Sequence, residues 1–458
     1  MGMGRRKVHF IGIGGSGMSG IAVILLHQGC KVSGSDLQEG AATQRLADMG
    51  ADIFIGHDAA NIGHDPDLVI ISTAIGENNP ELIEARRRGL EIIKRGQMLA
   101  RLMTEKKGIA VAGAHGKTTT SSMIALIFER NGLDPTIVVG GDITELGGNA
   151  KPGDGEYLVA EADESDGSFL LLSPTIEVIT NIEDDHLDYY GSREAIKDAF
   201  REFVVKIPPD GCGVMCVDDE NVRELASVCG KNLITYGLNG TADYYAKEIR
   251  TEGLRTFADI YYKGDLLGRL ELNVPGVHNI NNAIAAIAVG RAVGLQFEAI
   301  TGVLQNFRGV HRRFQLLGDI NGISVVDDYA HHPTEVKATL RAAQSTKANR
   351  VIGVFQPHRF TRTKFLYREF GEAFSDADII VINEIYPAGE APIQGVSANL
   401  IVTAIADREK RPVHYFSTTG EITDFLYQIA EPGDLILTLG AGNIRTVGVD
   451  LVEMLKAR

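Results

Sequence analysis

The hydrophobic and polar positions of the first hundred residues predict repeated strand–loop–helix units. Val8 to Ile11 is an apolar run that leads into a glycine-rich stretch, which is typical of a buried strand followed by a tight turn. Apolar residues between Ile21 and Leu26 predict a helix that stops at Gly29. Further runs predict strands at 31–35, 68–72 and 91–94. Strands that alternate with helices predict a parallel sheet.

A second block starts with the same alternation. Gly108 to Val111 predicts a strand, and apolar residues at 123, 124, 127 and 128 have the spacing of the helix that follows it. Strands are expected at 136–139, 157–160 and 177–180, a small antiparallel addition at 240–275, and a buried helix at 281–293.

A third block begins near Leu317 and predicts another α/β unit. Its expected strands are 322–326, 351–355, 379–383 and 435–439, with helical segments between them. The polar stretch from Thr104 to Lys107 predicts the boundary between the first and second blocks. In doubly wound sheets of this kind, ligands collect at the carboxyl ends of the strands. We therefore expect the residues that follow strands of the second block to converge near Lys117, namely Glu161, Asp163, Glu164, Asp166 and the segment 181–186.

Composition narrows the class of protein. The chain has 458 residues, enough for two to four domains, and its formal charge of −15 argues against nucleic acid as a partner. Four cysteines do not make a disulfide scaffold and fit a reducing compartment. No apolar run reaches the roughly 18 residues of a membrane span, and glycines between positions 12 and 20 interrupt any signal-peptide helix. We therefore expect a cytoplasmic protein without membrane insertion.

The most informative motif is Ala-Gly-Ala-His-Gly-Lys-Thr-Thr-Thr at 112–120, between an expected strand and an expected helix. Its glycines let backbone N–H groups surround phosphate oxygens at the positive end of the helix dipole. Lys117 adds a charge for the outer phosphates, and Thr118 offers a hydroxyl to Mg²⁺. Gly113 and Gly116 stand two residues closer than in the common phosphate loop, and a purely structural turn is the alternative. The motif predicts binding of ATP or GTP.

A second glycine loop opens the chain. Gly12, Gly14 and Gly17, with Asp36 further on, fit the dinucleotide fingerprint. This pattern predicts a pyrophosphate at the start of the helix but does not say which nucleotide carries it. A tight structural connection between strand and helix is the alternative.

Acidic and histidine residues follow two strands of the second block. Glu161 is the first acid of Glu-Ala-Asp-Glu, and we choose it as a Mg²⁺ ligand over the alternative of a solvated loop. His186 closes the segment 181–186 and could face a second metal or an anionic substrate, although a single histidine is usually structural. Asn279 and Asn282 could cap the buried helix or contact a purine edge.

Basic residues gather around the third block. Arg313 lies in a cluster with arginines 308 and 312, for which a solvated surface is the default and a phosphate contact the alternative. Asp328 and His332 follow one strand, and Arg359 and Arg362 follow the next, where they could hold a carboxylate or phosphate. Gly-Ala-Gly-Asn at 440–443 could bring backbone N–H groups to the same crevice.

Seven segments together resemble the Mur ligases of bacterial cell-wall synthesis, over the whole chain. They are the 113–120 loop, Glu-Ala-Asp-Glu-Ser-Asp, Asn-Ile-x-x-Asp-His, His-Asn-x-x-Asn-Ala, Gly-Val-His-Arg-Arg-Phe, Asp-Asp-Tyr-x-His-His-Pro-Thr-Glu and Gln-Pro-His-Arg-Phe-x-Arg-Thr. The short phosphate loop is typical of that family. His-His-Pro-Thr-Glu and the opening glycine segment favour the branch that adds L-alanine.

The resemblance implies an α/β protein of three domains. They are a Rossmann-like domain for the UDP-sugar at 1–105, a central mononucleotide-binding domain of the P-loop type for ATP at 106–315, and a Rossmann-like domain for the amino acid at 316–458. It implies that ATP, with Mg²⁺, drives amide formation between the lactyl carboxylate of UDP-N-acetylmuramate and L-alanine through an acyl phosphate. We expect the protein to be a monomer or a homodimer.

The resemblance also implies roles for individual residues. Catalysis is implied for Lys117, His186, Arg313 and Asp328. ATP binding is implied for Gly113, Ala114, His115, Gly116, Lys117, Thr118, Thr119, Asn279, Asn282 and Arg313. The metal ligands would be Thr118, Glu161 and His186. UDP-sugar binding falls to Gly12, Gly14, Gly15, Gly17, Asp36, Ser72 and Thr73, and the alanine and lactyl end to His332, Arg359 and Arg362.

Three other functions stay open at this point. A ligase that joins a recycled cell-wall tripeptide to the same sugar would carry most of the same motifs. An NAD-dependent oxidoreductase would explain the first glycine loop but not Lys117. A non-catalytic relative that binds nucleotide is disfavoured by intact Lys117, Thr118, Glu161 and His186.

Overall fold

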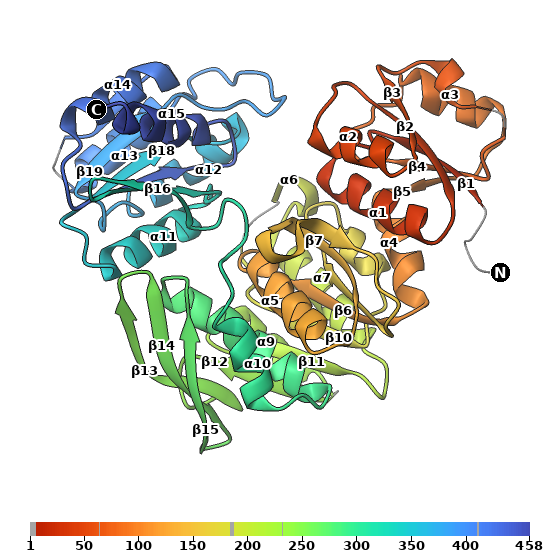
Figure 1. The fold of residues 1–458 in the computed structure, drawn as a ribbon, viewed down its shortest axis with the longest axis horizontal. Helices are drawn as coiled ribbons and strands as arrows, with labels where there is room; N and C mark the ends of the chain where they lie inside the picture. Colours follow the sequence, from red (N-terminus) through yellow and green to blue (C-terminus); the bar gives the residue numbers. More distant parts are fainter. Residues whose placement is uncertain (1–5, 64, 184–186, 231, 410–411) are drawn as a thin grey trace. The chain divides into compact units, whose positions relative to one another are not determined.

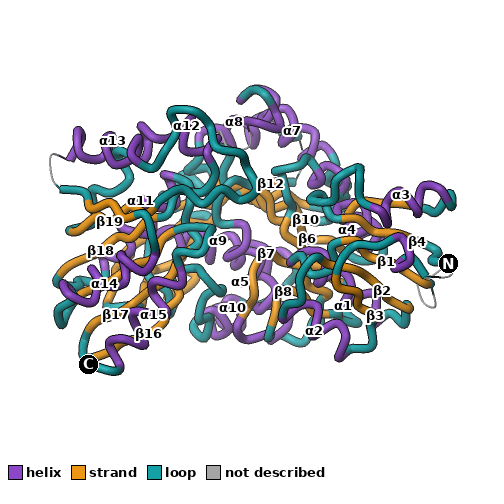
Figure 2. Tube along the Cα trace, turned by 90° about the horizontal axis from the view of Figure 1, so that it is seen from above, coloured by secondary structure: helices purple, strands orange, loops and turns teal. Residues whose placement is uncertain are grey.

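Three β-sheets, each flanked by helices, make up the protein (Figure 1). The computed structural model describes residues 6–63, 65–183, 187–230, 232–409 and 412–458. The chain packs into two compact units: unit 1 consists of Met1–Lys247, Ile260–Gly268 and Asn281–Leu304, and unit 2 of Glu248–Asp259, Arg269–Ile280 and Gln305–Arg458. In the Cα trace of Figure 2, helices lie on both faces of the sheets.

The N-terminal sheet has five parallel strands in the order β3-β2-β1-β4-β5. Its strands are β1 (Lys7–Ile11), β2 (Lys31–Asp36), β3 (Asp52–Ile55), β4 (Leu68–Ile71) and β5 (Ile92–Lys94). Its helices are α1 (Ser16–His27), α2 (Ala41–Asp48), α3 (Pro80–Arg87) and α4 (Arg95–Thr104), with a short 3₁₀ turn at Ala59–Asn61. Strand order reverses at β1, so the end of β1 is the point where such sheets bind ligands.

The central sheet has ten strands in the order β15-β14-β13-β12-β11-β10-β6-β9-β7-β8. They are β6 (Lys107–Ala112), β7 (Thr136–Ile143), β8 (Gly148–Lys151), β9 (Tyr157–Glu161), β10 (Ile176–Ile179), β11 (Cys212–Cys216), β12 (Leu233–Gly237), β13 (Tyr244–Glu252), β14 (Arg255–Tyr262) and β15 (Asp265–Leu272). The helices are α5 (Lys117–Arg130), α6 (Leu187–Tyr190), α7 (Arg193–Val205), α8 (Glu220–Val228), α9 (Val277–Ala292) and α10 (Phe297–Leu304). Helix α5 is buried on nearly all sides, as a helix inside a large core must be.

The C-terminal sheet has six strands in the order β16-β17-β21-β18-β19-β20, all parallel except the β16–β17 pair. They are β16 (Gln315–Ile320), β17 (Ile323–Asp328), β18 (Arg350–Phe355), β19 (Ile379–Asn383), β20 (His414–Phe416) and β21 (Asp434–Leu439). The helices are α11 (Pro333–Ser345), α12 (Phe360–Phe370), α13 (Asn399–Glu409), α14 (Thr419–Ile429) and α15 (Arg445–Lys456). Separate apolar clusters fill the two faces of this sheet.

The predicted α/β class is confirmed, and so is the addition at 240–275. Two-residue turns join β13 to β14 and β14 to β15, which only antiparallel neighbours allow. Six strands escaped prediction, namely β3, β8, β11, β12, β16 and β20, because their apolar runs are short and most are interrupted by polar or small residues. The expectation that Asp328 follows a strand was wrong, since β17 extends to this residue, which is buried.

Candidate active site

The 112–120 segment runs from the end of β6 into the first turn of α5, and residues 113–116 form the loop between them, inside the central sheet. Gly113 and Gly116 have φ angles of +131° and +81°. A Cβ atom at Gly113 would lie 2.2 Å from Thr180 Oγ1, and one at Gly116 would lie 2.6 Å from Asn282 Oδ1. Both glycines are therefore required by conformation and by space.

Residues at the end of β10 hold this loop in place. The backbone N–H of His115 donates to Asn181 Oδ1 at 2.8 Å, and the His115 carbonyl accepts from Thr180 Oγ1 at 2.6 Å and Asn181 Nδ2 at 2.9 Å. The predicted convergence of segment 181–186 on the loop is confirmed for Asn181. His186 lies outside the described residues.

Lys117 begins α5, and its ammonium group is held by three acceptors. It donates to the carbonyl oxygens of Gly113 at 2.5 Å and Ala114 at 3.2 Å and to Glu164 Oε1 at 2.7 Å. Burial lowers the pKa of Lys117, but the negative charges of Glu164, Glu161 and nearby acids outweigh it and raise the pKa overall. Lys117 is therefore a buried, charged group, and all three of its protons are engaged.

Thr118 and Glu161 provide hard oxygen atoms near Lys117. Thr118 lies in the first turn of α5 and is 9% exposed. Glu161 is the last residue of β9, the strand beside β6, and Glu161 Oε2 accepts from the Gly140 N–H at 2.9 Å. A hydroxyl and a carboxylate suit Mg²⁺, which takes few protein ligands.

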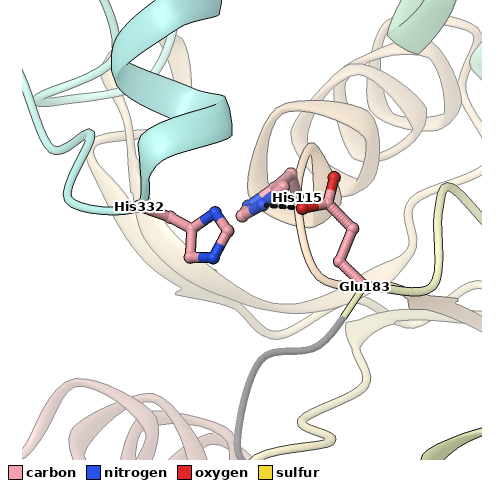
Figure 3. Close-up of side chains that lie close together, drawn as sticks. All are labelled: His115, Glu183 and His332. Atoms are coloured by element: carbon pink, nitrogen blue, oxygen red, sulfur yellow. Dashed lines mark hydrogen bonds and ion pairs between the residues drawn. The ribbon is translucent and has the colours of Figure 1, made fainter. Parts of the chain in front are cut away.

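His115 extends from the loop toward Glu183, which follows β10. Its Nε2 lies 3.3 Å from Glu183 Oε2, as the dashed line in Figure 3 shows. The loop therefore carries an imidazole that is oriented by a carboxylate.

Asn282 contacts the same loop from α9, and Asn279 lies one turn earlier. Asn282 Oδ1 accepts from Thr120 Oγ1 at 3.2 Å, and Asn279 Nδ2 donates to the Pro275 carbonyl at 2.7 Å. Both side chains are almost fully buried. Their contact with adenine stays a prediction.

In the N-terminal glycine loop, the first N–H groups are already bonded within the protein. The N–H groups of Gly12 and Ile13 donate to the Ser35 carbonyl at 2.8 and 2.9 Å, and that of Gly14 donates to Asp36 Oδ2 at 2.8 Å. Any diphosphate at this loop must therefore rely on the start of α1. Gly15 precedes that helix as its N-cap, and Gly17 lies in its first turn.

Ser72 and Thr73 follow β4 beside the loop. A Cβ atom at Gly12 would lie 3.1 Å from Ser72 Cβ, and Thr73 is exposed in the turn that follows. These positions suit the predicted role in binding the sugar nucleotide, which stays a prediction.

Two residues that the sequence did not indicate contact the start of α1. Arg95 is so close to Gly17 that a Cβ atom there would lie 2.8 Å from Arg95 Nη1, and Arg95 Nη2 donates to Asp163 Oδ2 at 2.7 Å. Asn149 of β8 donates to the Ser16 carbonyl at 2.9 Å and to Ser16 Oγ at 2.8 Å. Both link the first glycine loop to the central sheet, and no local sequence signal marks either.

In unit 2, Asp328 is a buried carboxyl at the end of β17. It accepts from the N–H groups of Phe314 and Ala330, both at 2.8 Å. Burial raises its pKa to about 6, although the charge of Arg313 opposes the shift. Arg313 Nη1 lies 3.5 Å from Glu335 Oε1, and its guanidinium stands 5.5 Å from the centre of the Tyr329 ring.

The ends of β17 and β18 carry a row of aromatic and basic side chains. The ring of His331 lies 5.9 Å from that of His358, and Arg362 Nη1 lies 3.4 Å from His358 Nδ1. Burial lowers the pKa of His331 to about 4 and that of His358 to about 3. Both imidazoles are therefore neutral at pH 7.

The remaining residues predicted for this end lie at helix starts. His332 is the N-cap of α11 and is 7% exposed. Arg359 is the N-cap of α12 with a φ of +72°, a strained value for a non-glycine residue. The expectation that segment 440–443 brings backbone N–H groups to this crevice stays a prediction. The Gly440 N–H donates to the Asp328 carbonyl at 3.1 Å, and the carbonyl oxygens of Gly440 and Gly442 accept from Arg312.

Three family models match the chain. They are described as the Mur ligase family catalytic domain over residues 7–107, the Mur ligase middle domain over residues 111–290, and the Mur ligase glutamate ligase domain over residues 312–442.

Curated relatives match over almost the full length. A UDP-N-acetylmuramate–L-alanine ligase of Pelotomaculum thermopropionicum is 59% identical over 453 residues, which are 99% of this chain and 98% of the relative. The enzyme of the same name from Desulforamulus reducens is 53% identical over 455 residues, with coverage of 99% and 98%.

Two solved structures show the same architecture. A UDP-N-acetylmuramate–alanine ligase of Thermotoga maritima superimposes with a TM-score of 0.83 at 30% identity and covers 98% of this chain and 99% of its own. A murein peptide ligase of Psychrobacter arcticus gives a TM-score of 0.70 at 26% identity, with 98% of each chain covered.

Proposed function

Because the chain belongs to the Mur ligase family, we propose that it joins L-alanine to the lactyl carboxylate of UDP-N-acetylmuramate in peptidoglycan precursor synthesis. ATP transfers its γ-phosphoryl group to the carboxylate and leaves as ADP, and the alanine amine then attacks the acyl phosphate and displaces inorganic phosphate as the amide forms. The observation that carries this proposal is the phosphate loop between β6 and α5, with its buried charged Lys117 and its two obligatory glycines.

The choice of amino acid rests on the relatives. Curated proteins named for L-alanine addition are 59% and 53% identical to this chain, whereas the murein peptide ligase is 26% identical. The tripeptide ligase is therefore the weaker candidate. An oxidoreductase is not supported, because all three family models belong to ligases.

In the central domain we assign ATP to the 113–119 loop. Lys117 neutralises the outer phosphates once it exchanges one of its three present acceptors for a phosphate oxygen. Thr118 and Glu161 would hold Mg²⁺, with His186 as our further ligand, and the ion would supply positive charge beside the phosphates. Asn279 and Asn282 contact the adenine.

The sugar nucleotide is assigned to the N-terminal domain. Its diphosphate lies at the start of α1, near Gly15 and Gly17, and the guanidinium of Arg95 stands beside it. Gly12 and Gly14 shape the loop, with Asp36, Ser72 and Thr73 around it.

We assign the amino acid and the lactyl end to the C-terminal domain. Asp328 has a catalytic role, and His332, Arg359 and Arg362 bind the alanine end, while Arg313, near the end of the central domain, contacts phosphate. The domains are 1–105, 106–315 and 316–458. We propose a cytoplasmic monomer or homodimer; no described helix has the length and apolar character of a membrane span.

The deciding experiment measures phosphate release with ATP, Mg²⁺ and UDP-N-acetylmuramate, offering L-alanine and the tripeptide to the same preparation. The expected result is turnover with L-alanine at least a hundredfold faster than with the tripeptide. Faster turnover with the tripeptide would assign the chain to recycling, and release with neither amine would contradict the proposal.

A further inference from the structure

A fully buried carboxylate lies beneath the N-terminal glycine loop, at a place that the proposed reaction does not use. Glu81 belongs to the first turn of α3, and its side chain has no exposed surface. It packs against the face of the sheet that carries His9 of β1 and Ser35 of β2.

Four donors surround the Glu81 carboxylate. Oε2 accepts from His9 Nε2 at 2.7 Å and from Ser35 Oγ at 2.9 Å. Oε1 accepts from His57 Nδ1 at 3.0 Å and from Asn61 Nδ2 at 3.3 Å. Burial raises the pKa of Glu81, but the hydrogen bonds from His9, Ser35 and His57 outweigh burial and lower it overall, so the group is ionised.

This arrangement is not a hydrolytic triad, although it holds a serine, histidines and an acid. Ser35 is completely buried, and its hydroxyl donates to the carboxylate, while Ser35 Oγ also lies 3.0 Å from His57 Nδ1. No reacting group could reach it. The cluster therefore acts on the structure around it.

Ser35 connects the cluster to the glycine loop. Its hydroxyl is fixed by Glu81, and its backbone carbonyl accepts the N–H groups of both Gly12 and Ile13. The next residue, Asp36, accepts the N–H of Gly14. Three consecutive loop amides are thus held by the end of β2, and Glu81 is the buried anchor of that end.

We propose that Glu81 is a positioning residue for the sugar nucleotide. Through Ser35 it fixes the curvature of the glycine loop, and so the direction in which the start of α1 faces the diphosphate. This inference rests on the proposed function, because it assigns UDP-N-acetylmuramate to that loop.

The test compares variants of the full-length chain. Glu81→Gln keeps the size of the side chain but places an amide among donors, and Ser35→Ala removes the hydroxyl link while leaving Glu81 and both histidines in place. We expect KM for UDP-N-acetylmuramate to rise about tenfold in the first and about threefold in the second, with kcat and KM for ATP within about twofold. Because both changes act on one path, the double variant should be no worse than Glu81→Gln.

Two matched controls accompany them. Glu84→Gln changes an acid on the same helix that pairs with Arg87 and Arg88 at the surface. Ser33→Ala changes the other hydroxyl of β2 that contacts the cluster, through His9 Nδ1. Neither should alter KM for the sugar nucleotide.

A second measurement does not depend on turnover. Hydrogen–deuterium exchange of the peptide covering residues 8–20 should be faster in Glu81→Gln and Ser35→Ala and unchanged in the controls. An unchanged KM with unchanged exchange, or an equal rise in KM for all substrates, would overturn the inference. If the wild-type chain binds no UDP-N-acetylmuramate in calorimetry, the proposed function fails, while exchange still tests the link between Glu81 and the loop.

Discussion

Glu177 should make the unfolding free energy of this protein fall as pH rises. It lies in β10, in register with Ala110 of β6 and Gly213 of β11. It is 0% exposed, and neither carboxylate oxygen has a hydrogen-bond partner among the described residues. Burial raises the pKa of Glu177 from 4.5 to about 9, with Lys206 opposing the shift.

The sign and size of the effect follow from this pKa. In the folded chain Glu177 keeps its proton up to about pH 9, whereas the unfolded chain loses it near pH 4.5. Stability is therefore fully present below pH 4.5 and is lost as pH rises toward 9. At about 1.4 kcal/mol per pH unit, the unfolding free energy falls by about 4 kcal/mol between about pH 5 and about pH 8.

Glu177→Gln removes this titration and keeps the shape of the side chain. Calorimetric melting of both chains at about pH 5 and about pH 8 should show that the advantage of the variant in Tm grows by about 10 °C at the higher pH, for a melting transition of about 200 residues, the size of the central domain. Glu202→Gln is the control, because it removes an exposed carboxylate 3.5 Å from the same Lys206. An equal Tm difference between wild type and Glu177→Gln at both pH values would refute the reasoning.

Three further predictions concern turnover. Lys117→Ala should lower kcat by about a thousandfold without loss of the fold, and phosphate release above about a tenth of the wild-type rate would contradict the role of Lys117. Arg95→Ala should raise KM for UDP-N-acetylmuramate about tenfold and leave KM for ATP unchanged, and an effect on ATP alone would place Arg95 elsewhere. Because burial raises the pKa of Asp328 to about 6, kcat should fall below that pH if the ionised form acts. Asp328→Asn should lower kcat at every pH and remove this acid limb from the pH–rate profile, and a profile that keeps the limb would assign it to another group.

Much of the phosphate site could be predicted because its signals are local. Gly113 and Gly116 stand where a strand turns into a helix, and the structure requires both. The convergence of Glu161 and Asn181 on the loop follows from a parallel sheet, in which β9 and β10 flank β6 and end at the same edge.

The contacts between distant segments could not be predicted. Arg95 meets Asp163 across 68 positions, and Asn149 meets Ser16 across 133. Such pairs depend on how whole elements pack, and neither hydrophobic spacing nor a motif records them. Glu81 was missed for the same reason, since an acid near a helix start is usually a surface residue that favours the helix dipole.

Asn149 of β8 donates hydrogen bonds to Ser16, so residues outside the N-terminal domain help to hold the first turn of α1. An N-terminal domain that ends at residue 105 would lose these two hydrogen bonds, and the start of its α1 would differ from that of the full-length enzyme. Inhibitor screens on such a fragment would select compounds for a conformation of the α1 start that differs from that of the full-length enzyme. Fragments meant for ligand discovery at the sugar-nucleotide end should therefore extend at least through β8.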